Sequence, residues 1–96
     1  MWHFRLVKGE SMLPSYRPGQ TIIVSHSRRF GIGDVVVVFM QSREALKRIT
    51  DMKDGKVFVE GDNPDKSTDS RQLGWIVDRH IVGIVTWPKK KLKGRW

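Results

Sequence analysis

The chain has 96 residues, 39% of them hydrophobic, and a net charge of +8, which indicates one small folded domain. It contains no cysteine, so disulfide frameworks, thiolate metal sites and cysteine nucleophiles are excluded. The three histidines, His3, His26 and His80, are far apart and lie in no metal-ligand spacing, so the sequence indicates neither a metal site nor a cofactor.

The predicted elements are short strands separated by turns. Residues 2–8 alternate apolar Trp2, Phe4 and Leu6 with other side chains, a period of two that favours a strand. Residues 17–20, RPGQ, suit a type II turn. The runs TIIVS (21–25) and DVVVVFM (34–40) are rich in β-branched residues and predict two more strands, with residues 27–34 as a loop.

The second half of the chain continues this pattern. Residues 44–52 and 56–60 predict strands on either side of Asp54-Gly55, a strong hairpin signal. Residues 61–74 are too polar for a regular element and predict a long structured loop, and residues 80–87 predict the last strand. The fold class is therefore mainly β, a single small domain of coiled antiparallel sheets in a barrel or sandwich. Any helix is a short turn, as at residues 11–16, where Pro14 limits its length.

The excess positive charge lies at the end of the chain. Residues 89–96, KKKLKGRW, hold five of the 18 basic residues, and without them 13 basic residues stand against 10 acidic ones. We therefore divide the chain into a domain over residues 1–88 and a basic tail over residues 89–96. The tail is interpreted as solvated, with weak contact to an anionic membrane as an alternative, and we expect no specific nucleic acid partner.

Ser11, in the stretch VKGESMLPSYRPGQTIIV, is a candidate nucleophile. A serine hydroxyl needs a base to activate it, and the usual base is histidine. The GxSxG elbow is absent, and no histidine stands beside a recognisable acid. A lysine remains, provided that burial lowers its pKa enough to keep the amine neutral.

Lys47, in EALKRIT, is the candidate base. On a strand it shares a face with Ala45 and Ile49, while Leu46 and Arg48 share the other. The strand pattern alone favours a solvated surface lysine, because lysine is seldom fully buried.

The loop GDNPDKSTDSR contains a dense set of polar side chains, among them Asp62, Ser67, Asp69 and Arg71. These side chains have two interpretations. They form turns by bonding to their own backbone, or they support a neighbouring active site through a hydroxyl and an Asp–Arg pair.

Three segments together resemble the type I signal peptidase family. GESMLPSYRPG resembles its nucleophile box, LKRI its lysine box, and GDNPDKSTDSRQLGWIV with IVGIV its C-terminal box. The boxes follow in family order over residues 7–85. The resemblance implies a mainly β Ser/Lys endopeptidase that binds a precursor protein or peptide as an extended strand and needs no cofactor.

The resemblance also implies residue roles. Ser11 matches the nucleophile and Lys47 the general base. The backbone N–H of Ser11 would donate to the oxyanion, with the Gly9 backbone as a second donor. The supporting residues implied are Ser67, which holds the lysine amine, the pair Asp69 and Arg71, and Asp62.

Two features of the chain depart from the family. Gly9 replaces a serine that some members use in the oxyanion hole, and Ser15 stands where the family often has threonine. A third departure is expected from the eight residues that precede Gly9, which are too few for the membrane anchor usual in that family. The short form is closer to the nickel-type superoxide dismutase maturation proteases, which implies removal of an N-terminal leader or signal-type extension from a precursor.

Two other functions remain open at this stage. One is a non-enzymatic β module that binds nucleic acid or anionic membrane through the tail, and the other is a self-cleaving regulator of the SOS-repressor kind. No apolar run approaches the roughly 20 residues that span a bilayer. We expect a soluble, cytoplasmic protein, with a peripheral membrane protein or the soluble part of a membrane-anchored chain as alternatives. Neither the substrate nor the oligomeric state is predicted.

Overall fold

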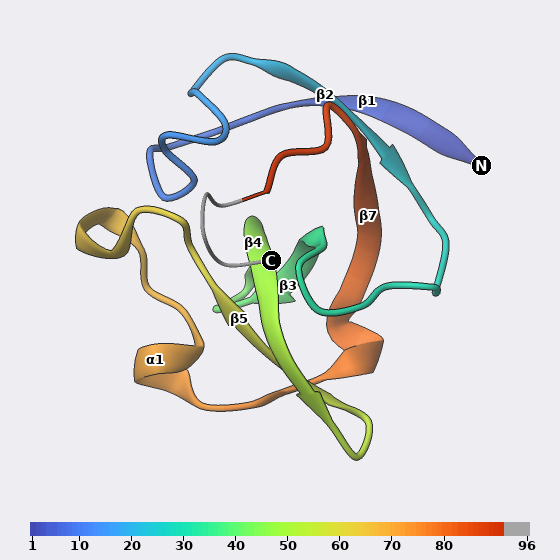
Figure 1. Cartoon of the computed structure of the whole chain (residues 1–96), viewed down its shortest axis with the longest axis vertical. Coiled ribbons are helices and arrows are strands. Elements are labelled where there is room, and N and C mark those ends of the chain that lie inside the picture. Colours follow the sequence, from blue (N-terminus) through green and yellow to red (C-terminus); the bar gives the residue numbers. More distant parts are fainter. Residues whose placement is uncertain (92–96) are drawn as a thin grey trace.

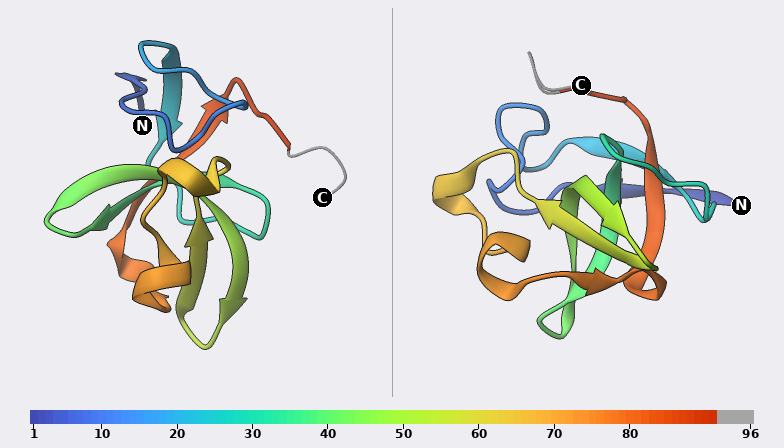
Figure 2. Two further views of the ribbon diagram at one scale, coloured as in Figure 1. Left: turned by 90° about the vertical axis from the view of Figure 1, so that its left-hand side faces the viewer. Right: turned by 60° about the horizontal axis from the view of Figure 1, so that its bottom comes forward.

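The computed structural model describes residues 1–91, which form one antiparallel sheet with the strand order β1-β2-β7-β3-β4-β5-β6 (Figure 1). The mainly β, single-domain prediction is confirmed, and the sheet is open and strongly coiled (Figure 2). Its strands are β1 (Trp2–Leu6), β2 (Thr21–Ser25), β3 (Val35–Met40), β4 (Arg43–Lys53), β5 (Lys56–Glu60), β6 (Ile76–Val77) and β7 (Ile81–Trp87).

Strand β7 joins the two parts of the sheet. It pairs with β2 on one side and with β3 on the other, although it is the last strand in the chain. The β1–β2 pair and the β3–β6 strands therefore belong to one sheet only through β7 (Figure 1). This arrangement places residues 7–11, which follow β1, within reach of β4.

The core explains the continuous valine run of β3. Val35 and Val37 pack into one buried cluster with residues near β1, β2 and β7, whereas Val36 and Val38 pack into a second cluster with β4, β5 and β7. Both faces of β3 are covered, so the strand has no need for polar alternation.

Strand β1 behaves in the opposite way. Its apolar side chains Trp2, Phe4 and Leu6 are each more than 60% exposed, and the residues between them are half-buried. The period of two predicted this strand but did not show which face the domain would cover.

The turns follow local sequence at two of three places. Gln20 N–H donates to the Arg17 carbonyl at 3.1 Å, with Gly19 at φ +84°, and Asp54 and Gly55 both take positive φ between β4 and β5. The third turn, between β3 and β4, places Gln41 and Ser42 at positive φ, and these residues gave no turn signal.

The predicted polar loop contains two short helical segments, η1 (Pro64–Lys66) and α1 (Ser70–Leu73). A third, η2 (Asp78–His80), precedes β7. Residues 11–16 form turns and no helix.

The described part of the basic tail lies against the domain. The Tyr16 hydroxyl donates to the Pro88 carbonyl at 2.5 Å and accepts from the Lys90 N–H at 3.2 Å. Lys89 Nζ lies 4.0 Å from Asp34 Oδ1. The remaining tail residues, including Lys93 and Arg95, lie outside the described residues.

Candidate active site

Ser11 lies on a turn that two buried side chains anchor. The Tyr16 N–H donates to the Met12 carbonyl at 3.0 Å, and the Leu13 N–H donates to the Glu10 carbonyl at 3.2 Å. Met12 and Tyr16 are each 1% exposed and belong to the core cluster beneath β2 and β7. Ser11 itself stays half-buried, so its position is fixed from below while its hydroxyl remains accessible.

The polar loop holds the same turn from the other side. The Asn63 backbone N–H donates to the Ser11 carbonyl at 2.8 Å, and Asn63 Nδ2 donates to the Glu10 carbonyl at 3.0 Å. The Ser15 hydroxyl donates to Asp62 Oδ2 at 2.6 Å. Asn63 and Ser15 were not predicted as site residues, because nothing in their local sequence indicates contact with a segment about 50 positions away.

Lys47 is buried, and the surface interpretation of its strand pattern is wrong. It lies opposite Val36 in the β3–β4 pair, on the same face as Ala45 and Ile49, and is only 4% exposed. The polar contact to its side chain comes from the loop over residues 61–69 and not from a neighbouring strand. Lys47 Nζ donates to Ser67 Oγ at 2.9 Å.

Burial lowers the pKa of Lys47 below the ordinary lysine value. The nearby Arg43 and Arg71 guanidinium groups act in the same direction, and the Asp69 carboxylate opposes them. Removing the amine from water disfavours its charged form, so the site favours a neutral lysine more than solvent does.

Asp69 organises the support behind Lys47. It is fully buried and accepts hydrogen bonds from Ser67 Oγ at 2.5 Å, from the Gly61 N–H at 2.7 Å and from Arg71 Nη2 at 2.6 Å. Burial alone would raise the pKa of this carboxyl group, but the bonds from Arg71, Ser67 and Gly61 outweigh it and hold the pKa well below its usual range. Asp69 is therefore ionised, and Ser67 directs its proton toward it.

Arg71 completes this support. Its side chain also donates to Asp69 Oδ1 through Nε at 2.9 Å, and Nη1 lies 3.7 Å from Glu60. Asp69 additionally caps α1, with its side chain accepting from the Arg71 N–H and its own N–H donating to Gln72. The helix start and the ion pair fix the same carboxylate.

Gly61 lies at the closest approach between the two sides of the site. A Cβ atom built at this position would lie 2.3 Å from Ser67 Oγ and 2.7 Å from the Ser11 carbonyl oxygen. Only a residue without a side chain lets the turn that carries Ser11 and the loop that carries Ser67 lie this close.

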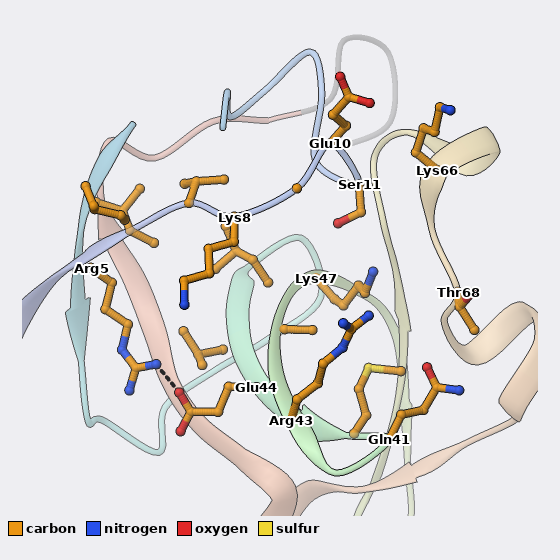
Figure 3. Close-up of a pocket in the computed structure, with 18 residues that line it drawn as sticks. Arg5, Lys8, Glu10, Ser11, Gln41, Arg43, Glu44, Lys47, Lys66 and Thr68 are labelled. Carbon is orange, nitrogen blue, oxygen red and sulfur yellow. Dashed lines mark hydrogen bonds and ion pairs between the residues drawn. The ribbon is translucent and has the colours of Figure 1, made fainter. Parts of the chain in front are cut away.

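A groove of about 960 Å³ lies between the Ser11 turn and β4. Its lining includes residues 5–11 on one side and residues 43–47 of β4 on another, so both Ser11 and Lys47 face it. Figure 3 shows the Ser11 hydroxyl directed into the groove on the side of Lys47. Within residues 1–91 no direct hydrogen bond joins the two side chains, and Lys47 bonds to Ser67 instead.

The sequence matches a known protein family over most of its length. A family described as Peptidase S24-like matches residues 4–86, a region that contains all the candidate residues described above. The chain belongs to the Peptidase S24-like family. A search of curated proteins gave no match. The chain therefore has a serine-peptidase-like fold.

Asp62 lies in this S24-like domain at a different place from the other supporting residues. It forms a buried ion pair with Arg48, whose Nε and Nη2 donate to the carboxylate at 2.9 and 2.7 Å. Arg48 is 0% exposed and also donates to the Gly33 and Lys90 carbonyls. Asp62 thus holds Ser15 and the interior of the domain, while Asp69 contacts the lysine support.

The S24-like domain leaves several backbone donors free around Ser11. Within residues 1–91, the N–H groups of Gly9 and Ser11, like those of Glu10 and Met12, donate to no backbone carbonyl. Gly9 takes φ +72°, a conformation that glycine adopts without strain.

None of the helices in the described part of the chain is long and apolar enough to cross a membrane.

Proposed function

We propose that this protein is a serine endopeptidase in which Ser11 is the nucleophile and Lys47 the general base. The observation that supports it most is the buried Lys47 amine, bonded to Ser67 and facing the same groove as the Ser11 hydroxyl. A lysine held in this way has little structural purpose, since burying its charge disfavours folding.

The support behind Lys47 suits a base. Because Ser67 donates to the ionised Asp69, its oxygen is left to accept a hydrogen from Lys47. A neutral amine that donates to Ser67 keeps its lone pair for another proton. The separation of Ser11 and Lys47 is in keeping with the general behaviour of free enzymes, in which catalytic hydrogen bonds tighten when substrate binds.

The reaction then runs in two halves. Lys47 takes the Ser11 proton while the serine oxygen attacks the peptide carbonyl, and the backbone N–H groups of Ser11 and Gly9 stabilise the oxyanion. The C–N bond breaks, and Lys47 returns the proton to the leaving amine. Water next gives a proton to Lys47 and attacks the ester carbonyl. The bond between the acyl carbon and the serine oxygen then breaks, the carboxylic acid leaves, and Lys47 returns the proton to the Ser11 oxygen.

The groove suits an extended peptide. β5 pairs with β4 only from Arg48 onward, so residues 43–47 lack a partner on that edge. β1 pairs only with β2 and forms one edge of the sheet. A peptide strand lying between them would use these backbone groups, as in β-strand addition.

We further propose that the substrate is a precursor from which an N-terminal leader is removed. This rests on the three sequence boxes shared with signal peptidases and, among these, on the short form similar to the superoxide dismutase maturation proteases. Membership of the S24-like family favours a second candidate, self-cleavage by a regulator. A self-cleaving chain would react at a rate independent of protein concentration, whereas a processing peptidase cleaves an added substrate repeatedly.

The test uses precursor proteins encoded in the same genome, with cleavage read by mass spectrometry. Ser11→Ala and Lys47→Met are each expected to reduce the rate by about a thousandfold or more, since each removes a group required in both halves of the reaction. Lys56→Met, on the exposed face of β5 and outside the groove, is the matched control and keeps full activity. Cleavage by folded Lys47→Met at the wild-type rate would overturn the proposal.

A further inference from the structure

The charges of the groove are unequal. Among the described residues, its lining contains five basic side chains against two acidic ones, Glu10 and Glu44. Arg5 and Glu44 form an ion pair that crosses from β1 to β4 (Figure 3). The basic residues are Arg5, Lys8, Arg43, Lys47 and Lys66.

Arg43 is a basic side chain that is free to bind a ligand in the groove. It starts β4, four positions before Lys47, and therefore belongs to the same face of the strand. Its guanidinium extends into the groove toward Lys47 in Figure 3, and its charge contributes to the lowered pKa of that lysine. Within residues 1–91 it has no carboxylate partner.

Lys8 lines the groove on the side of β1, across from the β4 side that carries Arg43. It follows β1, and Figure 3 shows its amine directed into the groove, whereas the Glu10 carboxylate points away from it. Lys8 also has no carboxylate partner among the described residues. Two unpaired cations thus lie on either side of the path between the free edges of β1 and β4.

We propose that this groove selects peptides that carry a Glu or Asp side chain near the cleaved bond, bound by Arg43 and Lys8. This substrate class rests on the proposed peptidase function and specifies it further. A guanidinium binds a carboxylate through two parallel hydrogen bonds, and charge-assisted bonds of this kind are about twice as strong as neutral ones.

A peptide fits these observations better than a nucleic acid. Within residues 1–91, no aromatic side chain lines the groove, although proteins that bind single strands stack bases on aromatic rings. The unpaired strand edges instead offer main-chain hydrogen bonds, which a peptide can satisfy along its length. The two cations would then discriminate among side chains.

The experiment separates binding from cleavage. Acetylated and amidated decapeptides of alanine, serine and glycine carry one Glu at each position in turn, and the Gln versions serve as uncharged isosteres. Binding to the full-length Ser11→Ala protein is measured by fluorescence anisotropy, and cleavage by the wild-type protein is measured in parallel. We expect the Glu peptide at one or more central positions to bind on the order of tenfold more tightly than its Gln version. This preference should weaken as salt is added.

Variants assign the preference to its residues. In the Ser11→Ala background, Arg43→Gln is expected to reduce the Glu preference to within about twofold, and Arg43→Glu to favour a Lys peptide instead. Arg29→Gln, exposed and outside the groove, keeps the full preference. Arg43 is exposed at the start of β4, so these changes leave the core intact.

Three results would overturn the inference. They are equal binding of Glu and Gln peptides at all positions, an unchanged Glu preference in Arg43→Gln, and displacement of every peptide alike by a single-stranded oligonucleotide. Tight Glu-dependent binding without cleavage of any peptide by the wild-type protein would contradict the peptidase proposal alone, and the charge selectivity of the groove would stand.

Discussion

At the scale of single residues, Lys47 is the group on which burial and charge act together. Its strand lies among valines, its amine contacts one hydroxyl, and two guanidinium groups oppose its protonation. The Asp69 carboxylate, which favours the ammonium form, reaches Lys47 only through Ser67. The Asp69 carboxylate, which could pair with a charged Lys47, is thus separated from the amine by the Ser67 hydroxyl.

The pH dependence of cleavage follows from this arrangement. Protonated Lys47 cannot accept a proton, so kcat/KM should rise with pH through the pKa of the amine and level off above it. Burial and the two guanidinium groups place this pKa below the ordinary lysine value of 10.5, so the rise should occur below that pH. Rates measured with an uncharged peptide over a series of pH values test this expectation.

The Arg43→Gln variant tests whether the guanidinium charge contributes to the lowered pKa of Lys47. It removes one positive charge that disfavours the ammonium form, so the rise in kcat/KM should move to higher pH. Arg29→Gln should leave the position of the rise unchanged. A shift of the Arg43→Gln profile to lower pH would show that another group controls the rate.

At the scale of elements, the segment from β5 to α1 organises the site. Gly61 contacts Ser67 and Ser11, Asn63 holds the turn that carries the nucleophile, and Asp69 both starts α1 and holds Ser67. One loop therefore sets the position of Ser11 relative to the residues that hold the Lys47 amine.

Gly61→Ala should disturb both sides of this contact. The added methyl group would overlap the Ser67 hydroxyl and the Ser11 carbonyl, and overpacking of this kind destabilises a domain by about 1–3 kcal/mol. We expect urea unfolding to show that loss and peptide cleavage to fall by at least about tenfold under conditions where the variant is folded. Gly31→Ala is the matched control, because its Cβ would meet no atom within 4 Å. Wild-type cleavage by Gly61→Ala would show that the loop tolerates a wider separation.

The sequence predicted the elements better than the site that they form. Strands and the turn at Asp54-Gly55 follow from patterns within a few residues, and the structure confirms them. The turn at Gln41 and Ser42 was missed, because neither residue is typical of positive φ. Alternation assigned Lys47 to a face of β4 but could not show that a loop 20 positions later contacts its amine. Arg48, Gly61 and Asn63 acquire their roles only from contacts between distant segments.

At the scale of the whole molecule, Arg48 connects three segments that lie outside the paired strands. It contacts Asp62 in the polar loop, the Gly33 carbonyl before β3 and the Lys90 carbonyl after β7. Through Asp62 and Ser15 it also reaches the turn that carries Ser11. A single buried guanidinium thus fixes the loop, both strand ends and the nucleophile turn relative to one another.

Arg48→Met should therefore be strongly destabilising. It leaves the Asp62 carboxylate buried without its cation, a change that typically costs about 3–5 kcal/mol. Urea unfolding measures this loss, and Arg5→Met, which breaks the more exposed pair with Glu44, should cost less than about 1 kcal/mol. Adding Asp62→Leu to Arg48→Met should recover part of the stability. Equal losses for Arg48→Met and Arg5→Met would contradict the central role of Arg48.

The position of β7 has a consequence for the order in which the site can form. The turn that carries Ser11 follows β1, Lys47 lies on β4, and the sheet joins these two parts only through β7. During synthesis, residues 81–87 emerge after both of them, so the sheet that sets the register between the Ser11 turn and β4 is complete only once this strand has left the exit tunnel. For the proposed peptidase, we therefore expect cleavage activity to appear only after β7 has been synthesised.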